Sequence, residues 1–384
     1  MSPDRHVYLD HAAATPLRPE VAAAIAAAQA EGFANPSSQH AAGRAARRLL
    51  EDARERIMHA LGGRAAGDRL VFTSGSSEAN HLAIVGMASA VGRTGTVLFS
   101  RRDHPSAVAA VQRVVRGGWR GVELPLDADG RIDRQVAAVE IAAAAGAGAS
   151  ILSVTQPCGQ TGSIDDGPAA AGGVLVHVDA TQSAGLLPLD GAALPVATLA
   201  LAPHKFGGPR GIGGLIVRAD VAIAPVVVGT QEQGLRGGTE AVALAVGFAR
   251  ALELATADRE ADARRLAVLR DRFEGLAVAA AREAGVVATV VAAGGPRSPH
   301  ISTIAFAGVD RQALAMAADL AGVCLATGTA CASGASEPAP ALVAMGLDQS
   351  LVRGAVRFSF GRSTTGEEIE AAAARLGPLV RRCR

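Results

Sequence analysis

The chain has 384 residues, 49% of them apolar, and its 37 basic and 36 acidic residues leave a net charge of +1. This length suits one large α/β domain or two domains, while the balanced charge argues against a nucleic-acid clamp or a polybasic membrane anchor. Four cysteines are too few for a secreted disulfide framework, the first ten residues lack a signal-peptide core, and no uncharged apolar run reaches the ~18 residues of a membrane span. We therefore expect a cytoplasmic protein without membrane association.

From about residue 15 to 255, Ala-rich helical stretches alternate with short apolar runs. Helices are predicted at 20–30, 42–61 and 105–116, and strands at 70–73, 96–100, 151–155, 174–178, 198–202 and 214–217. Short buried strands that alternate with helices predict a mostly parallel central sheet flanked by helices. Residues 15–255 are accordingly assigned to a large α/β domain.

The rest of the chain has a different order of elements. Residues 256–285 predict one long amphipathic helix with four apolar residues on one face, namely Leu266, Leu269, Phe273 and Leu276. Strands are then predicted at 289–292 and 302–306, and helices near 311–321 and from about 366. This mixed order predicts a small α+β domain formed by residues 1–14 and 256–384.

One basic residue stands apart, because 36 of the 37 are arginine and only Lys205 is lysine. The abundance of Ala, Gly and Arg suggests drift toward GC-rich codons, under which a surface lysine can become arginine at little cost. A lysine that must lose its proton to attack a carbonyl cannot be replaced in this way, since guanidinium stays protonated. Lys205 also follows an apolar strand and precedes a glycine-rich turn, where α/β sheets collect functional groups. These features predict a Schiff-base lysine for pyridoxal 5'-phosphate.

That cofactor requires a phosphate cradle, a carboxylate at the pyridine nitrogen, a donor to the phenolic oxygen and a group on the ring face. Residues 73–78 follow a strand and open a helix, so their N–H and hydroxyl groups can bind a phosphate, although such a start is more often a simple N-cap. Asp179 ends another strand and would keep the pyridine nitrogen protonated. Gln182 can reach the phenolic oxygen, and His104 offers a ring to stack on the pyridine and a titratable nitrogen.

Together these motifs resemble the class V aminotransferase-like family, specifically its cysteine desulfurases of the NifS/IscS type. The resemblance runs nearly end to end, through YLDHAAATP at 8–16, NPSSQH at 35–40, TSGSSEAN at 73–80, DH at 103–104, DATQSAG at 179–185, HKFGGPRGIG at 204–213, QEQGLRGGTE at 231–240, TGTACASG at 327–334 and VRFSFGRSTTGEEI at 356–369. It implies the pyridoxal-phosphate-dependent fold type I and an enzyme that converts L-cysteine to L-alanine. The sulfur would be left as a persulfide for an acceptor protein.

The resemblance also implies roles for individual residues. The cofactor would be held by Ser76, Ser77, Asp179, Gln182, His204, Lys205 and Thr239. His104 would stack on its ring and act as general base on the substrate thiol. Thr239 is expected to reach the phosphate in the other subunit of a homodimer. Arg357 would clamp the substrate carboxylate, a bidentate role that suits guanidinium, and Asn35 would lie beside the substrate. No metal ion and no direct nucleic-acid contact are expected.

Cys331 is implied to be the catalytic cysteine that accepts the sulfur. It lies in TGTACASGASEP, a stretch that predicts a mobile exposed loop, as a thiolate that visits the cofactor and then delivers sulfur elsewhere would require. The small domain would thus carry both the Cys331 loop and Arg357. Cys324 and Cys158 are expected to be small packing residues, and Cys383 incidental.

Three departures from the family pattern leave alternatives open. Residues 157–162 read PCGQTG instead of Asn-Asn-Glu-x-Gly, Ala202 replaces a serine that would donate to the phosphate, and Gln233 and Ala241 replace an Arg and an Asn. One alternative is a related lyase acting on selenocysteine or a cysteine conjugate. Another is a catalytically weakened scaffold of a sulfur-transfer complex. A transaminase would have no need of the Cys331 loop.

Overall fold

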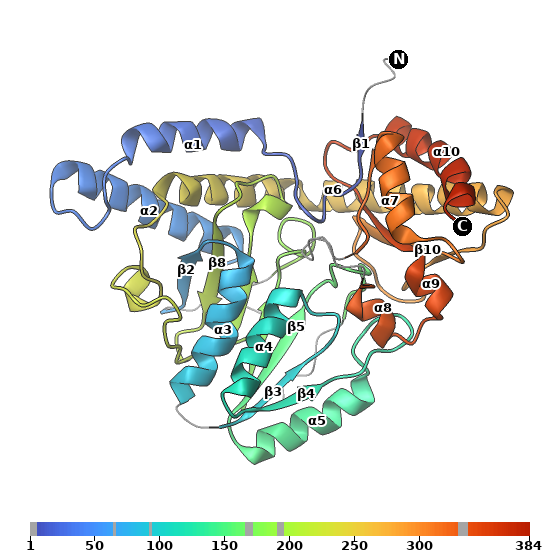
Figure 1. Cartoon of the computed structure of the whole chain (residues 1–384). Coiled ribbons are helices and arrows are strands. Elements are labelled where there is room, and N and C mark those ends of the chain that lie inside the picture. The colour runs from blue at the N-terminus through green and yellow to red at the C-terminus, as the bar shows by residue number, and fades with distance from the viewer. Residues whose placement is uncertain (1–5, 64–66, 92–93, 166–171, 190–195, 329–336) are drawn as a thin grey trace.

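The centre of the protein is a seven-stranded sheet with the strand order β2-β8-β7-β6-β5-β3-β4 (Figure 1). The computed structural model describes residues 6–63, 67–91, 94–165, 172–189, 196–328 and 337–384. The strands are β2 Arg69–Thr73, β3 Thr96–Phe99, β4 Arg120–Glu123, β5 Ser150–Thr155, β6 Val174–Asp179, β7 Thr198–Leu201 and β8 Gly213–Val217. Only β8 runs antiparallel to its neighbours, so the predicted mostly parallel α/β sheet is confirmed.

Helices cover both faces of this sheet because successive strand residues point to opposite sides. The side chains of Leu70, Phe72 and Leu152 join a core with four helices, α1 Pro19–Glu31, α2 Ala41–Ala60, α5 Arg134–Ala147 and the first part of α6 Val242–Glu283. Val71 and Ile151 join the opposite core with α3 Ser76–Val91 and α4 Pro105–Arg116. With both faces covered, β5 and β7 are buried along their whole length.

A second body packs beside the sheet and contains the C-terminal part of the chain (Figure 1). Its three-stranded antiparallel sheet has the order β12-β10-β9. The elements of this body are β9 Ala288–Val290, β10 Ile301–Phe306, α7 Arg311–Leu320, α8 Pro340–Ala344, α9 Gln349–Arg353, β12 Ala355–Ser359 and α10 Gly366–Arg382. The N-terminal β1 Val7–Tyr8 also joins it, through a parallel pair with β11 Val323–Cys324.

Helix α6 runs through both bodies as one element of 42 residues. It packs on α1 and α2 in the large body and on α10 in the small one. The helix expected from residue 256 thus begins already at Val242, because residues 242–255 are apolar on most faces and buried, which hides the amphipathic period. The proposed domain boundary at 255 therefore falls inside a continuous helix. No helix in the described residues is long and apolar enough to cross a bilayer.

The predicted apolar face of α6 is correct at three of its four residues. Leu266, Leu269 and Phe273 are 2%, 9% and 0% exposed, whereas Leu276 is 37% exposed and does not belong to the buried part of this face. At 100° per residue, Leu276 lies on the margin of the buried stripe, whereas Ala277 continues the stripe and is fully buried.

This difference predicts unequal effects of two truncations on stability. Phe273→Ala should lower the free energy of unfolding by about 3–5 kcal/mol, because the ring is fully buried and stacks against Phe358 and Phe360 at centroid distances of 4.7 and 5.4 Å. Leu276→Ala should cost about 1 kcal/mol or less. Urea unfolding followed by circular dichroism measures both, and equal losses would contradict the assigned burial.

Candidate active site

The carboxyl ends of β5, β6 and β7 lie side by side in the sheet. Thr155 is in register with Asp179, and Asp179 with Ala200. A 3-10 turn, Pro203–Lys205, follows β7 directly, so Lys205 and Asp179 lie at the same edge. His104 is tied to this edge, because its N–H donates to Thr155 Oγ1 at 3.2 Å. The structure therefore brings Lys205, Asp179 and His104 to one region.

The side chains of Lys205 and Gln182 meet at one backbone oxygen. Lys205 Nζ donates to the carbonyls of Ala12 at 2.7 Å and Ala13 at 2.9 Å. Gln182 Nε2 donates to the same Ala12 oxygen at 2.9 Å, and Gln182 Oε1 is 3.3 Å from Nε2 of the buried His300. The N-terminal motif at 8–16 thus orients two of the predicted site residues.

Asp179 is a buried carboxylate whose two oxygens both accept hydrogen bonds. It is 3% exposed, and its Oδ1 accepts from the Thr181 N–H at 3.0 Å. Its Oδ2 accepts from Asn80 Nδ2 at 2.8 Å, and the same nitrogen is 3.0 Å from Ser106 Oγ. Asn80 therefore lies between the strand-end carboxylate and the first turn of α4.

The segment between β2 and α3 has the form of an anion cradle. The first N–H groups of a helix have no partner within the helix, and Ser76, which begins α3, is half-buried, while Ser77 is exposed. Gly213 permits close packing beneath the cradle, because a Cβ at that position would lie 2.5 Å from the carbonyl carbon of Gly75. The Glu78 carboxylate accepts a hydrogen bond from the Ser74 N–H at 2.7 Å.

Arg357 is held from two directions within β12. It is 5% exposed, Nη1 donates to the Gly159 carbonyl at 2.8 Å, and Nη2 pairs with Asp10 at 2.9 Å. Its Nε has no hydrogen-bond partner among the residues that the structure describes. Asp10, in the same N-terminal motif, was not singled out from the sequence.

The remaining predicted site residues are less closely tied to the strand ends. Asn35 and Thr239 are exposed, and Asn35 Oδ1 accepts from the Ser37 N–H at 2.8 Å. His204 is half-buried, and its carbonyl accepts from both the N–H and the hydroxyl of Thr15. Cys331 lies outside the described residues, so its position relative to Lys205 stays a prediction.

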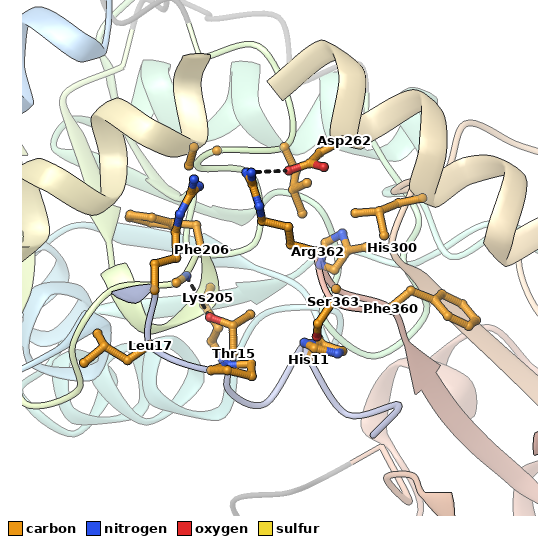
Figure 2. Close-up of a pocket in the computed structure, with 18 of the residues that line it drawn as sticks. His11, Thr15, Leu17, Lys205, Phe206, Asp262, His300, Phe360, Arg362 and Ser363 are labelled. Carbon is orange, nitrogen blue, oxygen red and sulfur yellow. Dashed lines mark hydrogen bonds and ion pairs between the residues drawn. The ribbon is translucent and has the colours of Figure 1, made fainter. Parts of the chain in front are cut away.

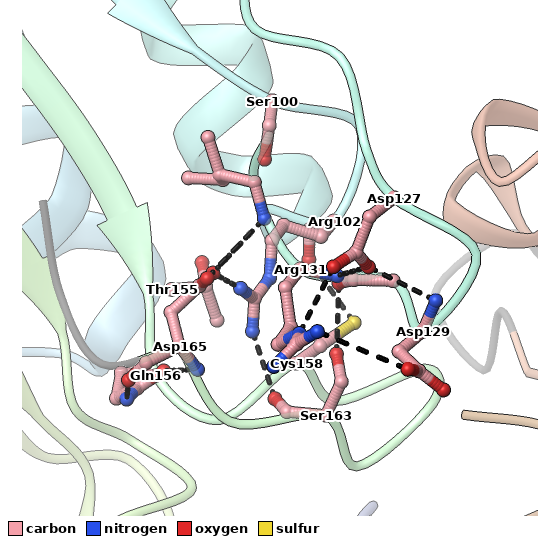
Figure 3. Close-up of polar contacts among 12 residues, drawn as sticks. Ser100, Arg102, Asp127, Asp129, Arg131, Thr155, Gln156, Cys158, Ser163 and Asp165 are labelled. Carbon is pink, nitrogen blue, oxygen red and sulfur yellow. Dashed lines mark hydrogen bonds and ion pairs between the residues drawn. The ribbon is translucent and has the colours of Figure 1, made fainter. Parts of the chain in front are cut away.

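Residues 157–162, which depart from the family pattern, and the residues that follow them lie beside a buried arginine, Arg102 (Figure 3). Arg102 forms an ion pair with Asp165, and its Nη2 donates to the Ser163 carbonyl at 2.8 Å. Cys158 is fully buried, and its thiol donates to the Arg102 carbonyl at 3.5 Å. This environment suits a packing residue.

Two glutamines, Gln156 and Gln160, lie near the position of the absent asparagines, and both side chains have other partners. Gln156 pairs with the backbone of Asp165, and Gln160 Oε1 accepts from the Ala341 N–H at 3.0 Å. The contact of Gln182 with the phenolic oxygen of a cofactor stays a prediction.

A cavity of about 330 Å³ adjoins Lys205 between α6 and the N-terminal segment (Figure 2). Its apolar walls include Phe206, Leu266 and Phe360, and Arg362 extends along one side toward Asp262. Of the predicted site residues that the structure describes, Lys205 alone lines it. Lys205 thus lines a cavity whose walls do not include His104, Asp179 or residues 73–78.

Several histidines near the site are kept neutral by burial. Desolvation lowers the pKa of His177 to about 4 and that of His300 to about 3. Desolvation and the nearby Lys205 lower the pKa of His204 to about 4. Burial has the opposite effect on a carboxyl group and raises the pKa of Asp103 to about 6, while its oxygens accept from the Ser100 and Thr155 N–H groups.

Comparisons with known proteins agree with this architecture. The family model described as "Aminotransferase class-V" matches residues 7–372. Among curated relatives, "Cysteine desulfurase IscS" of Dictyoglomus turgidum is 35% identical over 95% of this chain and 92% of its own length. The "IscS-like cysteine desulfurase" of Mycobacterium tuberculosis is 35% identical over 98% of this chain and 97% of its own.

Solved structures give the same result for the fold. A "NIFS-LIKE PROTEIN" superposes with a TM-score of 0.85 at 24% identity and covers 97% of this chain and 98% of that one. DndA from Streptomyces lividans superposes with a TM-score of 0.72 at 27% identity, covering 92% and 99% of the two chains.

The sheet order and the small C-terminal body are thus those of fold type I, as the sequence predicted. Within this fold the chain belongs to the class-V aminotransferase family, whose members generally depend on pyridoxal 5'-phosphate. The family identified from the motifs is confirmed.

Residues of the site that sequence reasoning missed are mostly partners of the residues it found. Asp10 and His300 contact Arg357 and Gln182, and Ser106 contacts His104. Asn80 carried a signal, because the chain contains only two asparagines and this one lies in the cradle motif. The other partners occur as ordinary residue types that only the tertiary structure brings to the site.

The buried histidines predict how stability depends on pH. Between the folded pKa values of about 4 for His177 and 3 for His300 and an unfolded value near 6.5, the unfolded chain binds more protons. Stability should therefore fall as pH drops below about 6.5, by up to ~1.4 kcal/mol per pH unit for each histidine. Because the pKa of Asp103 is raised to about 6, its protonation favours the folded state as the pH drops from about 6 to 4, which offsets part of the loss of stability.

Urea unfolding at pH 7 and pH 5 tests this slope. His300→Gln should reduce the loss of stability between the two pH values, whereas His59→Gln, at an exposed position, should leave it unchanged. A slope that is identical in wild type and His300→Gln would be inconsistent with a neutral buried His300.

Proposed function

We propose that this chain is a pyridoxal-phosphate-dependent cysteine desulfurase that converts L-cysteine to L-alanine and retains the sulfur as a persulfide on Cys331. The observation that carries the proposal is the single lysine of the sequence, placed at the carboxyl end of β7 beside the buried Asp179. It occurs in a class-V aminotransferase chain that is 35% identical to relatives named cysteine desulfurase.

The donor set at the strand ends fits the cofactor. When bound, pyridoxal 5'-phosphate withdraws electrons from the Cα of an amino acid joined to its aldehyde. Lys205 supplies the amine for that aldehyde, and the Asp179 carboxylate, already oriented by Asn80 and Thr181, supplies the partner for a protonated ring nitrogen. Gln182 is the amide donor to the phenolic oxygen.

The phosphate is assigned to the start of α3. The N–H groups there and the hydroxyls of Ser76 and Ser77 supply neutral donors, and a helix N-terminus favours a dianion. His204 is neutral at pH 7 because its pKa is about 4, so it contributes as a hydrogen-bond donor and not as a cation. Thr239, exposed in this chain, is assigned to the phosphate of a second subunit.

Arg357 and Asn35 are assigned to the substrate. The Arg357 guanidinium is buried and prearranged by Asp10 and Gly159, and its Nε has no partner among the described residues. A substrate carboxylate would therefore meet an oriented cation, which suits bidentate recognition. His104, at the start of α4, is assigned to the face of the cofactor ring.

The distinctive step is assigned to Cys331. Its thiolate forms a bond to the sulfur of L-cysteine as the Cβ–S bond breaks, so that Cys331 carries the extra sulfur and alanine leaves after proton uptake. The persulfide then passes to an acceptor protein. We assign this activity to a cytoplasmic homodimer.

Replacement of Cys331 tests the function directly. Cys331→Ser should still bind the cofactor and cysteine, as seen by a cysteine-dependent change in the absorbance spectrum, but alanine formation should fall about 10³-fold or more and no persulfide should be found by mass spectrometry. Cys383→Ser is the matched control and should keep both activities.

Substrate comparison separates the proposal from its alternatives. Normal alanine formation by Cys331→Ser, or turnover of selenocysteine or a cysteine conjugate with none of L-cysteine, would overturn the desulfurase assignment. Lys205→Ala should abolish the cofactor absorbance shift, and a wild-type protein that never acquires such a spectrum would instead be the weakened scaffold.

The contact between Gly213 and the cradle gives a second test. Gly213→Ala should raise the apparent dissociation constant for pyridoxal 5'-phosphate by about tenfold or more, since the new methyl group displaces Gly75 and the Ser76 N–H. Gly146→Ala, where a Cβ meets nothing within 4 Å, is the control. Absorbance titration measures both, and unchanged affinity in Gly213→Ala would argue against a phosphate in this cradle.

A further inference from the structure

A chain of buried hydrogen bonds runs behind the strand ends and joins the two groups assigned to opposite parts of the cofactor ring. It leads from Thr198 Oγ1 to His177 Nδ1 at 2.9 Å, and from His177 Nε2 to Asn80 Oδ1 at 3.0 Å. Asn80 Nδ2 then contacts both Asp179 Oδ2 and Ser106 Oγ. Ser106 Oγ finally lies 2.7 Å from His104 Nδ1.

The direction of each bond follows from the chemistry of its ends. A carboxylate only accepts, so the Asn80 amide must present Nδ2 to Asp179, and its Oδ1 must face His177. His177 then carries its proton on Nε2 and accepts at Nδ1 from the Thr198 hydroxyl. Burial, which lowers the pKa of His177 to about 4, keeps this ring neutral.

The same reasoning determines the state of His104. The Ser106 N–H can only donate, and it reaches His104 Nδ1 at 3.2 Å as the cap of α4. The Ser106 hydroxyl accepts one proton from Asn80, so its own proton is directed to His104 Nδ1. Two donors therefore meet at Nδ1, and the neutral ring carries its proton on Nε2.

From this geometry we propose that Asn80 is a positioning residue that couples Asp179 to His104 and keeps His104 Nδ1 as a hydrogen-bond acceptor, with the ring proton on Nε2. One amide nitrogen orients the carboxylate and, through the Ser106 hydroxyl, opposes protonation of His104 Nδ1. In this tautomer His104 presents Nε2–H to a ligand as a hydrogen-bond donor. Only the meaning for catalysis rests on the proposed function.

Two titratable neighbours of His104 in the described residues are His204 and Asp103. His204 faces His104 and is itself neutral at pH 7, because its pKa is about 4. Asp103 precedes His104, but its oxygens accept from the Ser100 and Thr155 N–H groups. The Asp179 carboxylate alone would favour a protonated histidine, yet Asn80 lies between the two.

The tautomer is measured by two-bond proton–nitrogen correlation spectra of the full chain labelled in histidine, with and without bound cofactor. His104 is assigned from the signal lost in His104→Gln. In the wild type, His104 should carry its proton on Nε2. Asn80→Ala frees the Ser106 hydroxyl to accept from Nδ1 and leaves the longer contact of the Ser106 N–H, at 3.2 Å, to oppose a proton there, so an Nδ1–H population should appear.

A double-mutant cycle separates this coupling from a structural effect. In Ser106→Ala the hydroxyl is gone, so adding Asn80→Ala should leave the His104 tautomer unchanged. Ser150→Ala removes another buried hydroxyl of the same sheet, bonded to Ala144 and Gly148, and should leave His104 as in the wild type. Asn80→Asp keeps the side-chain volume, and its carboxylate should turn the Ser106 hydroxyl away from His104, giving the same direction of change.

Three results would overturn the proposal. These are a wild-type His104 protonated on Nδ1, an effect of Asn80→Ala that is equal with and without Ser106, and no effect of either Asn80 variant. If Asn80→Ala does not fold, the wild-type tautomer and Asn80→Asp decide the outcome. Because these measurements need no turnover, their failure is distinguishable from failure of the desulfurase assignment, which the alanine assay reports.

Discussion

Thr155, Asp179 and Ala200 stand in one row across β5, β6 and β7, because parallel strands pair in fixed register. A shift by one residue in β6 would turn Asp179 to the other face of the sheet and remove it from Asn80. The row also sets the position of Lys205, which follows β7 after a single turn, and of His104, bound to Thr155. Asp179, Lys205 and His104 thus derive their positions from the pairing of three strands.

Three polar side chains buried around this row have charged or hydrogen-bonding partners. Burial of a charge or an amide without a partner costs several kcal/mol, so the surroundings must supply donors and acceptors. Asn80 uses all its donors and its oxygen, Arg102 pairs with Asp165, and Arg357 pairs with Asp10. Such pairing fixes each side chain before a ligand arrives, which is the arrangement that favours specific recognition.

Much of this protein could be predicted from its sequence, and the reasons are physical. The strands of the large sheet are short β-branched or apolar runs, so six of the seven were found; β4 was missed because its sequence, RGVE, is polar and mostly exposed. The start of α6 was missed since a helix buried on most sides shows no amphipathic period.

Some residues of the candidate site could likewise be found from the sequence, and others could not. Lys205 could be found because it is the single lysine of the sequence and follows a predicted strand, and Asp179 because it ends another predicted strand. Asp10, Ser106 and His300 carry none, because their significance lies in contacts between residues far apart in the chain. Cys331 rests on its motif and on the resemblance, since it falls outside the described residues.

The continuous course of α6 has a consequence for how the two halves of the molecule tolerate change. A helix of 42 residues is about 63 Å long and advances 100° per residue. The face that the first half of α6 turns toward α1 and α2 therefore fixes which face its second half turns toward α10. Inserting one residue in the middle of α6 would rotate its second half, and the small body packed on it, by about 100° around the helix axis. The residues of each contact surface would be unchanged, but the two bodies would no longer face each other in the same orientation.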